Sequence, residues 1–249
     1  MGLPSSDTAL GLVWDFSNFQ WYMIPFLVIL IYMIAKEIQK ENWSALLAAL
    51  AFWLMDWINE LWNAVVYRFT GAAFWSTPGV LQEINPGVFD YVPNSSLVIL
   101  VGLNIEIVFM FFMTGIVSTK MFKGTIQEEF AIEDLGERKA FRKKRLTNRI
   151  VIVFSMTALC IIIEILLNWI GILVWEWNGT SGLPNIWSWT NPILIYLIGY
   201  LHFWTISAIV YDCKRRWVQL TIVGTEFLIV VVAFITMGSL GWLNSLSIV

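Results

Sequence analysis

Long apolar runs separated by short polar segments dominate the pattern of residues along this chain. A helix needs about 20 mainly apolar residues to cross the hydrocarbon core of a bilayer. Runs of this length predict an all-α, polytopic bundle of six membrane-spanning helices. We place the six spans at residues 19–35, 44–68, 96–118, 150–175, 191–211 and 218–240.

The positions of Lys and Arg give the predicted helices a direction. All of the 15 basic residues except Arg68 fall in the segments 36–43, 119–149 and 212–217. Short basic loops stay on the cytoplasmic side of a membrane, so we expect both termini on the extracytoplasmic or lumenal side. A seventh, less hydrophobic span within residues 70–95 would break this alternation.

Composition supports a single transmembrane domain over residues 1–249. The chain is 58% hydrophobic and 13% charged, whereas soluble domains have about 25% charged residues. It has one His and two Cys, too few for His-rich di-iron, bis-His haem or zinc hydrolase sites. No predicted span carries a Lys that could hold retinal. We therefore expect no metal and no cofactor.

The segment Ala48–Phe69 stands out because polar residues interrupt an otherwise apolar predicted span. Asp56 and Glu60 are four residues apart, and Asn63 follows three residues later, so the three share one helix face. An ionised carboxylate near the bilayer centre costs roughly 2.5–3.5 kcal/mol on insertion scales. We therefore expect this face to line a protein interior or a wet cavity.

Other predicted spans also carry acidic and amide side chains. They are Asn104 and Glu106 in the third span, Glu164 and Asn168 in the fourth and Glu226 in the sixth. We predict that Lys and Arg are absent at the depth of these carboxyls. Carboxyl groups that share a low-dielectric site disfavour each other's ionised form. The sequence therefore predicts some neutral carboxylic acids inside the bundle at pH 7.

A weak internal similarity connects two of these polar faces. A shift of 108 residues aligns Asp56 with Glu164 and Glu60 with Asn168. This alignment predicts that spans two and three are repeated in parallel as spans four and five, with a functional site near their interface.

The acids and the many aromatic residues indicate protonation chemistry on an apolar substrate. A neutral acid in a dry pocket can protonate an alkene or epoxide, and aromatic faces stabilise the resulting carbocation. The chain offers 15 Trp, 17 Phe and 7 Tyr. Our candidate catalytic residues are Asp56, Glu60, Glu106 and Glu164. Our candidate substrate-binding residues are Trp53, Trp57, Asn59, Trp62, Asn63, Asn104, Asn168, Tyr200 and His202.

The arrangement of Trp57, Asn59, Glu60 and Trp62 in the second predicted span resembles the integral-membrane terpene cyclases of meroterpenoid pathways. More distantly, the chain resembles the membrane carotenoid (lycopene) cyclases. The order of these residues differs from the family pattern, and those families usually have seven spans. The resemblance implies Glu60 or Asp56 as the protonating acid and a prenylated substrate.

Two other functions fit the same residues. Intramembrane acids with Asn and Thr are also used by proton- or cation-coupled transporters and channels. The polar groups of a non-catalytic membrane subunit could instead hold partner proteins. In the enzyme interpretation, the partners are membrane lipids and a hydrophobic small-molecule substrate, and we expect no nucleic acid.

Overall fold

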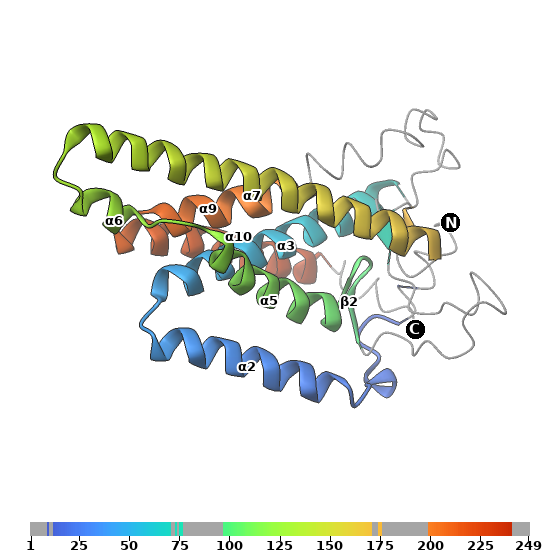
Figure 1. The fold of residues 1–249 in the computed structure, drawn as a ribbon. Helices are drawn as coiled ribbons and strands as arrows, with labels where there is room; N and C mark the ends of the chain where they lie inside the picture. The colour runs from blue at the N-terminus through green and yellow to red at the C-terminus, as the bar shows by residue number, and fades with distance from the viewer. Residues whose placement is uncertain are drawn as a thin grey trace.

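The computed structural model describes residue 9 and residues 12–70, 73, 75–76, 97–170, 174–175 and 199–240. Helices account for most of this part of the chain, as predicted (Figure 1). A short 3-10 turn, η1 (Phe16–Asn18), precedes them. The helices are α2 (Met23–Gln39), α3 (Trp43–Thr70), α5 (Ile105–Met121), α6 (Ile126–Ala131), α7 (Leu135–Ile170), α9 (Leu201–Asp212) and α10 (Arg216–Ser239).

Four stretches of the described chain are long and apolar enough to cross a membrane. They are Trp43–Phe69, Ile105–Ala131, Leu135–Leu166 and Arg216–Ser239. Helix α2 has 17 residues and α9 has 12, so both are shorter than these. Residues 191–198 of the predicted fifth span lie outside the described residues, and the count of six spans stays a prediction.

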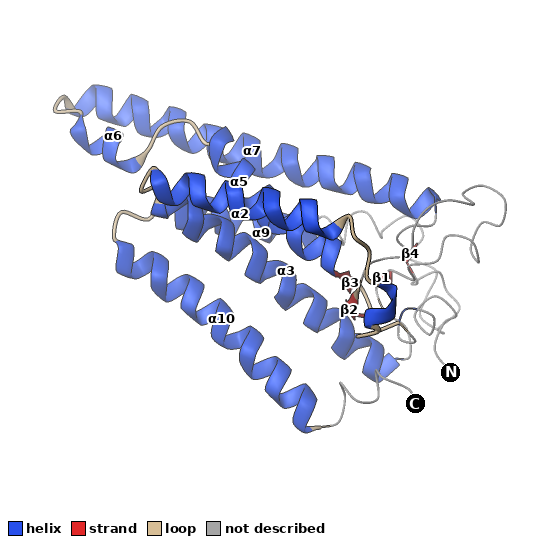
Figure 2. Cartoon of the chain, turned by 90° about the horizontal axis from the view of Figure 1, so that it is seen from below, coloured by secondary structure: helices blue, strands red, loops and turns tan. Residues whose placement is uncertain are grey.

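Helix α3 is the centre of the bundle. It packs against α5, α9 and α10 (Figure 2). In its most apolar window 56% of the residues are buried, against 22% in the corresponding windows of α7 and α10. A helix that is buried on most of its circumference belongs to the interior of a bundle. The helix that holds Asp56 and Glu60 is therefore more deeply buried than α7 and α10.

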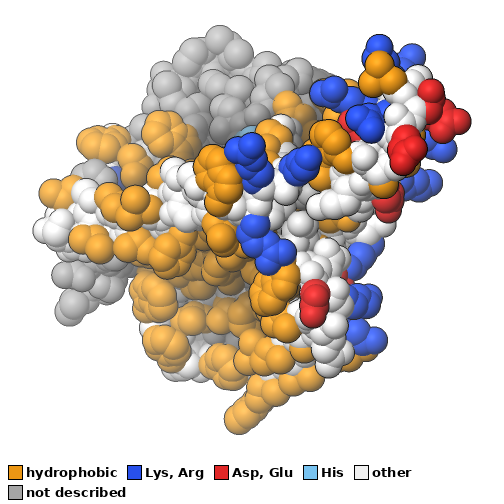
Figure 3. All heavy atoms as spheres, turned by 90° about the vertical axis from the view of Figure 1, so that its left-hand side faces the viewer, with side chains coloured by type: hydrophobic (Ala, Val, Ile, Leu, Met, Phe, Trp, Pro, Cys, Tyr) orange, Lys and Arg blue, Asp and Glu red, His pale blue; other side chains and the backbone are white. Residues whose placement is uncertain are grey.

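The basic segments lie together at one end of the bundle. The α2–α3, α5–α7 and α9–α10 connections are all at the left of Figure 1. Figure 3 looks onto this end, where Lys and Arg side chains gather beside broad apolar surfaces. We call it the basic end. Its position agrees with the predicted alternation of the described helices, while the side of the membrane that it faces stays a prediction.

Buried ion pairs connect the helices at the basic end. The Arg145 guanidinium on α7 contacts Glu129 of α6 at 2.9 Å and also contacts Asp212 of α9. Arg149, one turn later on α7, contacts Asp212 at 3.0 Å. Arg149 also donates to the backbone carbonyls of Lys123 and Gly124. These contacts join α6, α7 and the end of α9.

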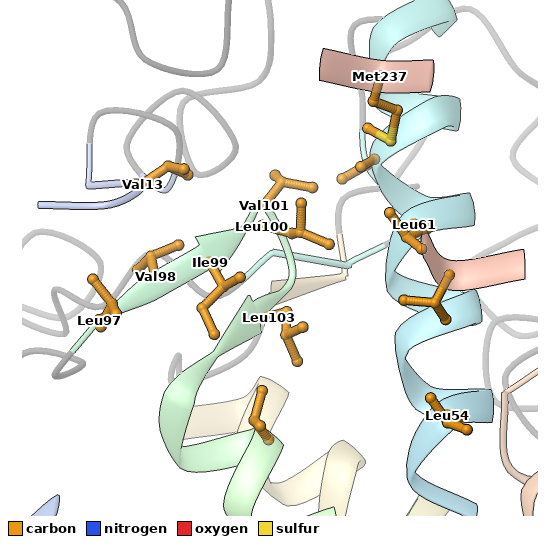
Figure 4. Close-up of a cluster of buried hydrophobic side chains, with 14 of the residues drawn as sticks. Val13, Leu54, Leu61, Leu97, Val98, Ile99, Leu100, Val101, Leu103 and Met237 are labelled. Atoms are coloured by element: carbon orange, nitrogen blue, oxygen red, sulfur yellow. The ribbon is translucent and has the colours of Figure 1, made fainter. Parts of the chain in front are cut away.

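At the opposite end, a β-hairpin occupies the start of the predicted third span. Strands β2 (Val98–Leu100) and β3 (Leu103–Asn104) pair antiparallel, with Val98 opposite Asn104. The hairpin side chains are buried with Leu54 and Leu61 of α3 in a hydrophobic cluster (Figure 4). The prediction of a helix from residue 96 was wrong. An apolar run rich in β-branched residues has the same hydropathy in a strand as in a helix.

Two further features differ from the predicted boundaries. Helix α7 begins at Leu135, well before the predicted residue 150, because its first turns are polar and hydropathy does not mark them. Strand β1 (Trp75–Ser76), after α3, pairs antiparallel with β4 (Val174–Trp175), after α7. This pairing connects the ends of α3 and α7 that lie away from the basic loops.

Candidate functional site

A cavity of about 290 Å³ lies among α3, α5, α7 and α9, beside the hairpin turn at Gly102. Its size is near the lower end of the 300–1,000 Å³ typical of small-molecule sites. Most of the wall is apolar or aromatic. These lining residues are Phe52, Ile107, Met110, Phe111, Met156, Leu159, Ile163, Tyr200, Phe203 and Trp204.

Three of the predicted catalytic acids line this cavity together. Asp56 and Glu60 come from α3, one helical turn apart, and Glu164 comes from α7. Asp56 and Glu60 are buried, whereas Glu164 is half-buried. The Oδ2 atom of Asp56 has no hydrogen-bonding partner among the described residues. The structure thus brings acids that are distant in sequence to one apolar space.

Tyr200 positions Glu164 from the opposite wall. Its hydroxyl donates a hydrogen bond to Oε1 of Glu164. The Tyr200 ring stacks on Phe111 with centroids 6.2 Å apart and meets Phe203 edge-on at 5.7 Å. Because these aromatic contacts fix the phenol, the Glu164 oxygen that it contacts is held as a hydrogen-bond acceptor.

A second polar pair lies on the α3–α9 side. The Asn59 amide donates to the carbonyl of Gly199 at 3.3 Å, and its Oδ1 lies 3.1 Å from Nε2 of His202. Because Oδ1 is an acceptor, Nε2 carries the proton in this arrangement. Asn59 and Gly199 line the cavity. His202 is absent from the described lining, and it holds Asn59 in place.

The Trp residues named from the sequence lie away from the described cavity lining. The Trp53 indole donates to the carbonyl of Val108 at 3.0 Å and packs on Phe112. Trp57 packs against Trp53 and against Phe234 of α10. The Trp62 side chain is 54% exposed. These three side chains serve helix packing and the protein surface, and the aromatic wall comes from other residues.

Three of the remaining candidates are also absent from the described lining, and the side chain of a fourth is not described. Asn104 caps the start of α5 by accepting from the Ile107 amide at 2.9 Å. Glu106 accepts a hydrogen bond from the Tyr22 hydroxyl, which connects α5 to the start of α2. Asn63 is fully buried in α3. Asn168 lies in α7, but its side chain lies outside the described residues.

The sequence interpretation missed most of the aromatic and sulfur-containing wall. Phe52, Phe111, Phe203 and Trp204 form much of it, with Phe52 and Trp204 edge-on at 4.7 Å. Phe52 lies four residues before Asp56 and therefore on the same face of α3. That spacing could have identified Phe52 as a wall residue from the sequence. The wall residues of α5 and α9 could not be found in this way, because packing between helices brings them to the cavity. Among the described residues, no cluster of three His, Cys, Asp or Glu could hold a metal ion.

Comparison with known proteins gives a family without an assigned activity. A family model described as an uncharacterized membrane protein family matches residues 4–239. An uncharacterized protein from Archaeoglobus fulgidus is 38% identical over 215 residues, which is 85% of this chain and 85% of that protein. No solved structure matches. Since the family match covers nearly the whole chain and the described helices are long and apolar, this chain is an integral membrane protein that belongs to that family.

Proposed function

We propose that this protein is an intramembrane enzyme that protonates an isoprenoid or another lipid-like substrate and so starts its cyclisation or isomerisation. The observation that carries the proposal is the meeting of Asp56, Glu60 and Glu164 in one apolar, aromatic cavity. Lys and Arg are missing from the described residues of its lining. Acids placed in this way favour the neutral form that can donate a proton.

Asp56 is the proposed proton donor. Its carboxyl is buried, lines the cavity and keeps one oxygen without a hydrogen-bonding partner in the described part of the chain. The π electrons of a substrate alkene take the proton, form a new C–H bond and leave a cation on the neighbouring carbon. The faces of Phe52, Phe111 and Trp204 stabilise that cation and keep water away from it.

Glu164 is the proposed acceptor that ends the reaction. A second alkene of the same chain can attack the cation with its π electrons and close a ring, or the cation can remain where it formed. Loss of a proton from the carbon beside the final cation then restores an alkene. The carboxylate oxygen that Tyr200 holds receives this proton. The product is an isomer of the substrate, and one proton has entered and one has left. Before the next turnover Glu164 releases its proton and Asp56 takes one up by exchange with the solvent, so both carboxyls return to their starting states.

The proposal includes a topology of six spans with the basic end in the cytoplasm. Under this topology the cavity lies in the extracytoplasmic half of the bundle. The parallel repeat of spans two and three with spans four and five also belongs to the proposal. Its support is that the aligned residues Asp56 and Glu164 line the same cavity.

The test follows deuterium from D₂O into lipid. Purified protein in lipid nanodiscs is incubated in D₂O with linear polyprenyl compounds and their terminal epoxides, and products are analysed by mass spectrometry. We expect a new isomer that carries deuterium on carbon. Asp56→Asn keeps the shape of the side chain and should lower the rate by about 10²–10⁴-fold. Glu60→Gln tests the second acid of α3 in the same assay.

Glu226→Gln is the matched control, because Glu226 is a buried acid of α10 that is absent from the described lining. It should keep the wild-type rate. Equal deuterium incorporation by wild type, Asp56→Asn and Glu60→Gln would overturn the proposal. Acid-dependent proton or cation flux into vesicles, without any isomer, would support a transporter instead.

A further inference from the structure

The exposure of the cavity wall changes from one helix to the next. The lining residues of α3, α9 and the hairpin turn are all buried. Every described lining residue that is exposed or half-buried belongs to α5 or α7. Met110 of α5 and Leu159 and Ile163 of α7 are 45–46% exposed. The cavity therefore opens sideways, between α5 and α7.

The outer surface of the two helices that border this opening is apolar. Val117 of α5 and Ile162 and Leu166 of α7 are each more than half exposed. Helix α5 forms most of the stretch Ile105–Ala131 and α7 contains the stretch Leu135–Leu166, and both stretches are long and apolar enough to cross a membrane. Exposed apolar side chains on such stretches face hydrocarbon in a bilayer. The opening therefore faces lipid chains, which favours an apolar ligand over a hydrated ion.

The cavity is large enough for the end of a lipid chain. Its volume of about 290 Å³ is room for roughly ten water-sized groups, or about two five-carbon isoprene units. A longer chain would have to remain partly outside, in the bilayer. Asp56 and Glu60 belong to the buried α3 wall of the cavity, whereas Met110 and Ile163 belong to its exposed α5 and α7 walls.

We infer that the cavity takes up the terminal part of a polyprenyl chain directly from the bilayer, through the opening between α5 and α7. This inference rests on the proposed function and names its substrate more closely: a membrane-resident isoprenoid whose reactive alkene lies at the end of its chain. The rest of the chain and the polar head stay in the membrane. Water-soluble polyprenyl fragments are not needed as substrates.

Photolabelling tests this uptake without requiring turnover. The protein in nanodiscs is illuminated with a polyprenyl lipid that carries a diazirine at the chain end, or the same lipid with the diazirine at the head. Peptide mapping should place the chain-end label on cavity residues such as Phe52 and Cys160. The head label should miss them. The double variant Met110→Trp with Ile163→Trp fills the opening and should reduce cavity labelling to the level without illumination.

The matched control is the double variant Val117→Trp with Ile162→Trp, on the same two helices but outside the described lining. It should label like wild type. Asp56→Asn should also label like wild type, because uptake does not use the acid. Cavity labelling in Asp56→Asn with no isomer from wild type would sink the proposed function and keep the uptake site. Undiminished cavity labelling in the filled variant, or cavity labelling by the head probe, would overturn the uptake route.

Discussion

Two clusters of buried ionisable groups in the bundle, one at the basic end and one in the cavity, differ in whether Lys or Arg lies beside the acids. At the basic end, Arg145 and Arg149 are 5% and 4% exposed, and both contact Asp212. In the cavity, Asp56 and Glu60 are equally buried, but the described lining offers no Lys or Arg to pair with them. Removing one partner of a buried ion pair is strongly destabilising. A buried carboxyl beside a described lining without Lys or Arg is a cost to the fold, which favours a chemical role for it.

The packing of helices differs between the same two places. At the basic half of α5, a Cβ on Gly115 would lie 2.9 Å from the backbone of Ala49 on α3. Toward the other end of the same helix pair, Phe52 and Phe111 border the cavity. Near Gly115 the backbones of α3 and α5 are therefore in close contact, whereas nearer the other end the two helices meet through larger aromatic side chains, with Phe52 and Phe111 5.8 Å apart between ring centroids.

The largest effect on stability should come from breaking the buried ion pairs. Arg149→Met removes one of the two Arg partners of Asp212 and the donor to two backbone carbonyls. We expect a loss of about 3–5 kcal/mol in the free energy of unfolding, measured by denaturant unfolding in detergent micelles. The exposed Arg142→Met should change it by less than about 0.5 kcal/mol.

The contrast becomes sharp when Asp56→Asn is measured in the same way. The cavity acid should be replaceable with no loss of stability, although its loss should lower the rate by about 10²–10⁴-fold. A loss as large as that of Arg149→Met would show that Asp56 holds the fold, and the contrast between the two regions would be wrong.

A smaller loss of stability is expected when the tight contact between α3 and α5 is disturbed. Gly115→Ala places a methyl group against backbone atoms that cannot rotate away, so we expect a cost of about 1–3 kcal/mol. Gly224→Ala on α10 is the matched control, because nothing lies within 4 Å of the added Cβ. Thermal unfolding should separate the two variants. Equal midpoints would mean that α3 and α5 are less closely packed than their backbones indicate.

The sequence alone predicted part of the site well. Spacing placed Asp56 and Glu60 on one face of α3, and the internal alignment linked Asp56 to Glu164; all three line the cavity. Hydropathy identified the helical bundle and the central segment. These successes rest on local periodicity and on the cost of burying acids, which need no tertiary information.

The other site residues could not be predicted, because their positions depend on how the helices are oriented about their axes against one another. Glu106 and Asn104 have the polar character of site residues, yet they serve a helix contact and a helix cap. The hairpin at Val98–Asn104 replaces the first turns of a predicted helix. Hydropathy alone could not separate these cases, although Asn104 after Gly102 was a local signal for a helix start.

At the basic end the buried acid Glu37 differs from the cavity acids because a Lys contacts it. Glu37, past the end of the predicted first span, contacts Lys120 of α5 and accepts from Asn42 at 2.7 Å. Burial acts to raise the pKa of the Glu37 carboxyl. The hydrogen bonds from Lys120 and Asn42 and the charges of Lys120 and Lys40 outweigh burial and lower the pKa below its ordinary value of 4.5.

The lowered pKa fixes the sign of the pH dependence. A carboxyl with a lower pKa in the folded state stabilises the fold above its unfolded pKa, and this contribution disappears as pH falls through the folded value. Because Lys120 is 45% exposed, we expect Glu37→Gln to cost at most about 1 kcal/mol at pH 7. The difference in the free energy of unfolding between the variant and wild type should close as the pH falls below 4.5 toward the lowered folded value.

Glu133→Gln, which removes one charge from an exposed side chain, is the control and should show no such difference at pH 7. A gap for Glu37→Gln that widens in acid would contradict the ion pair.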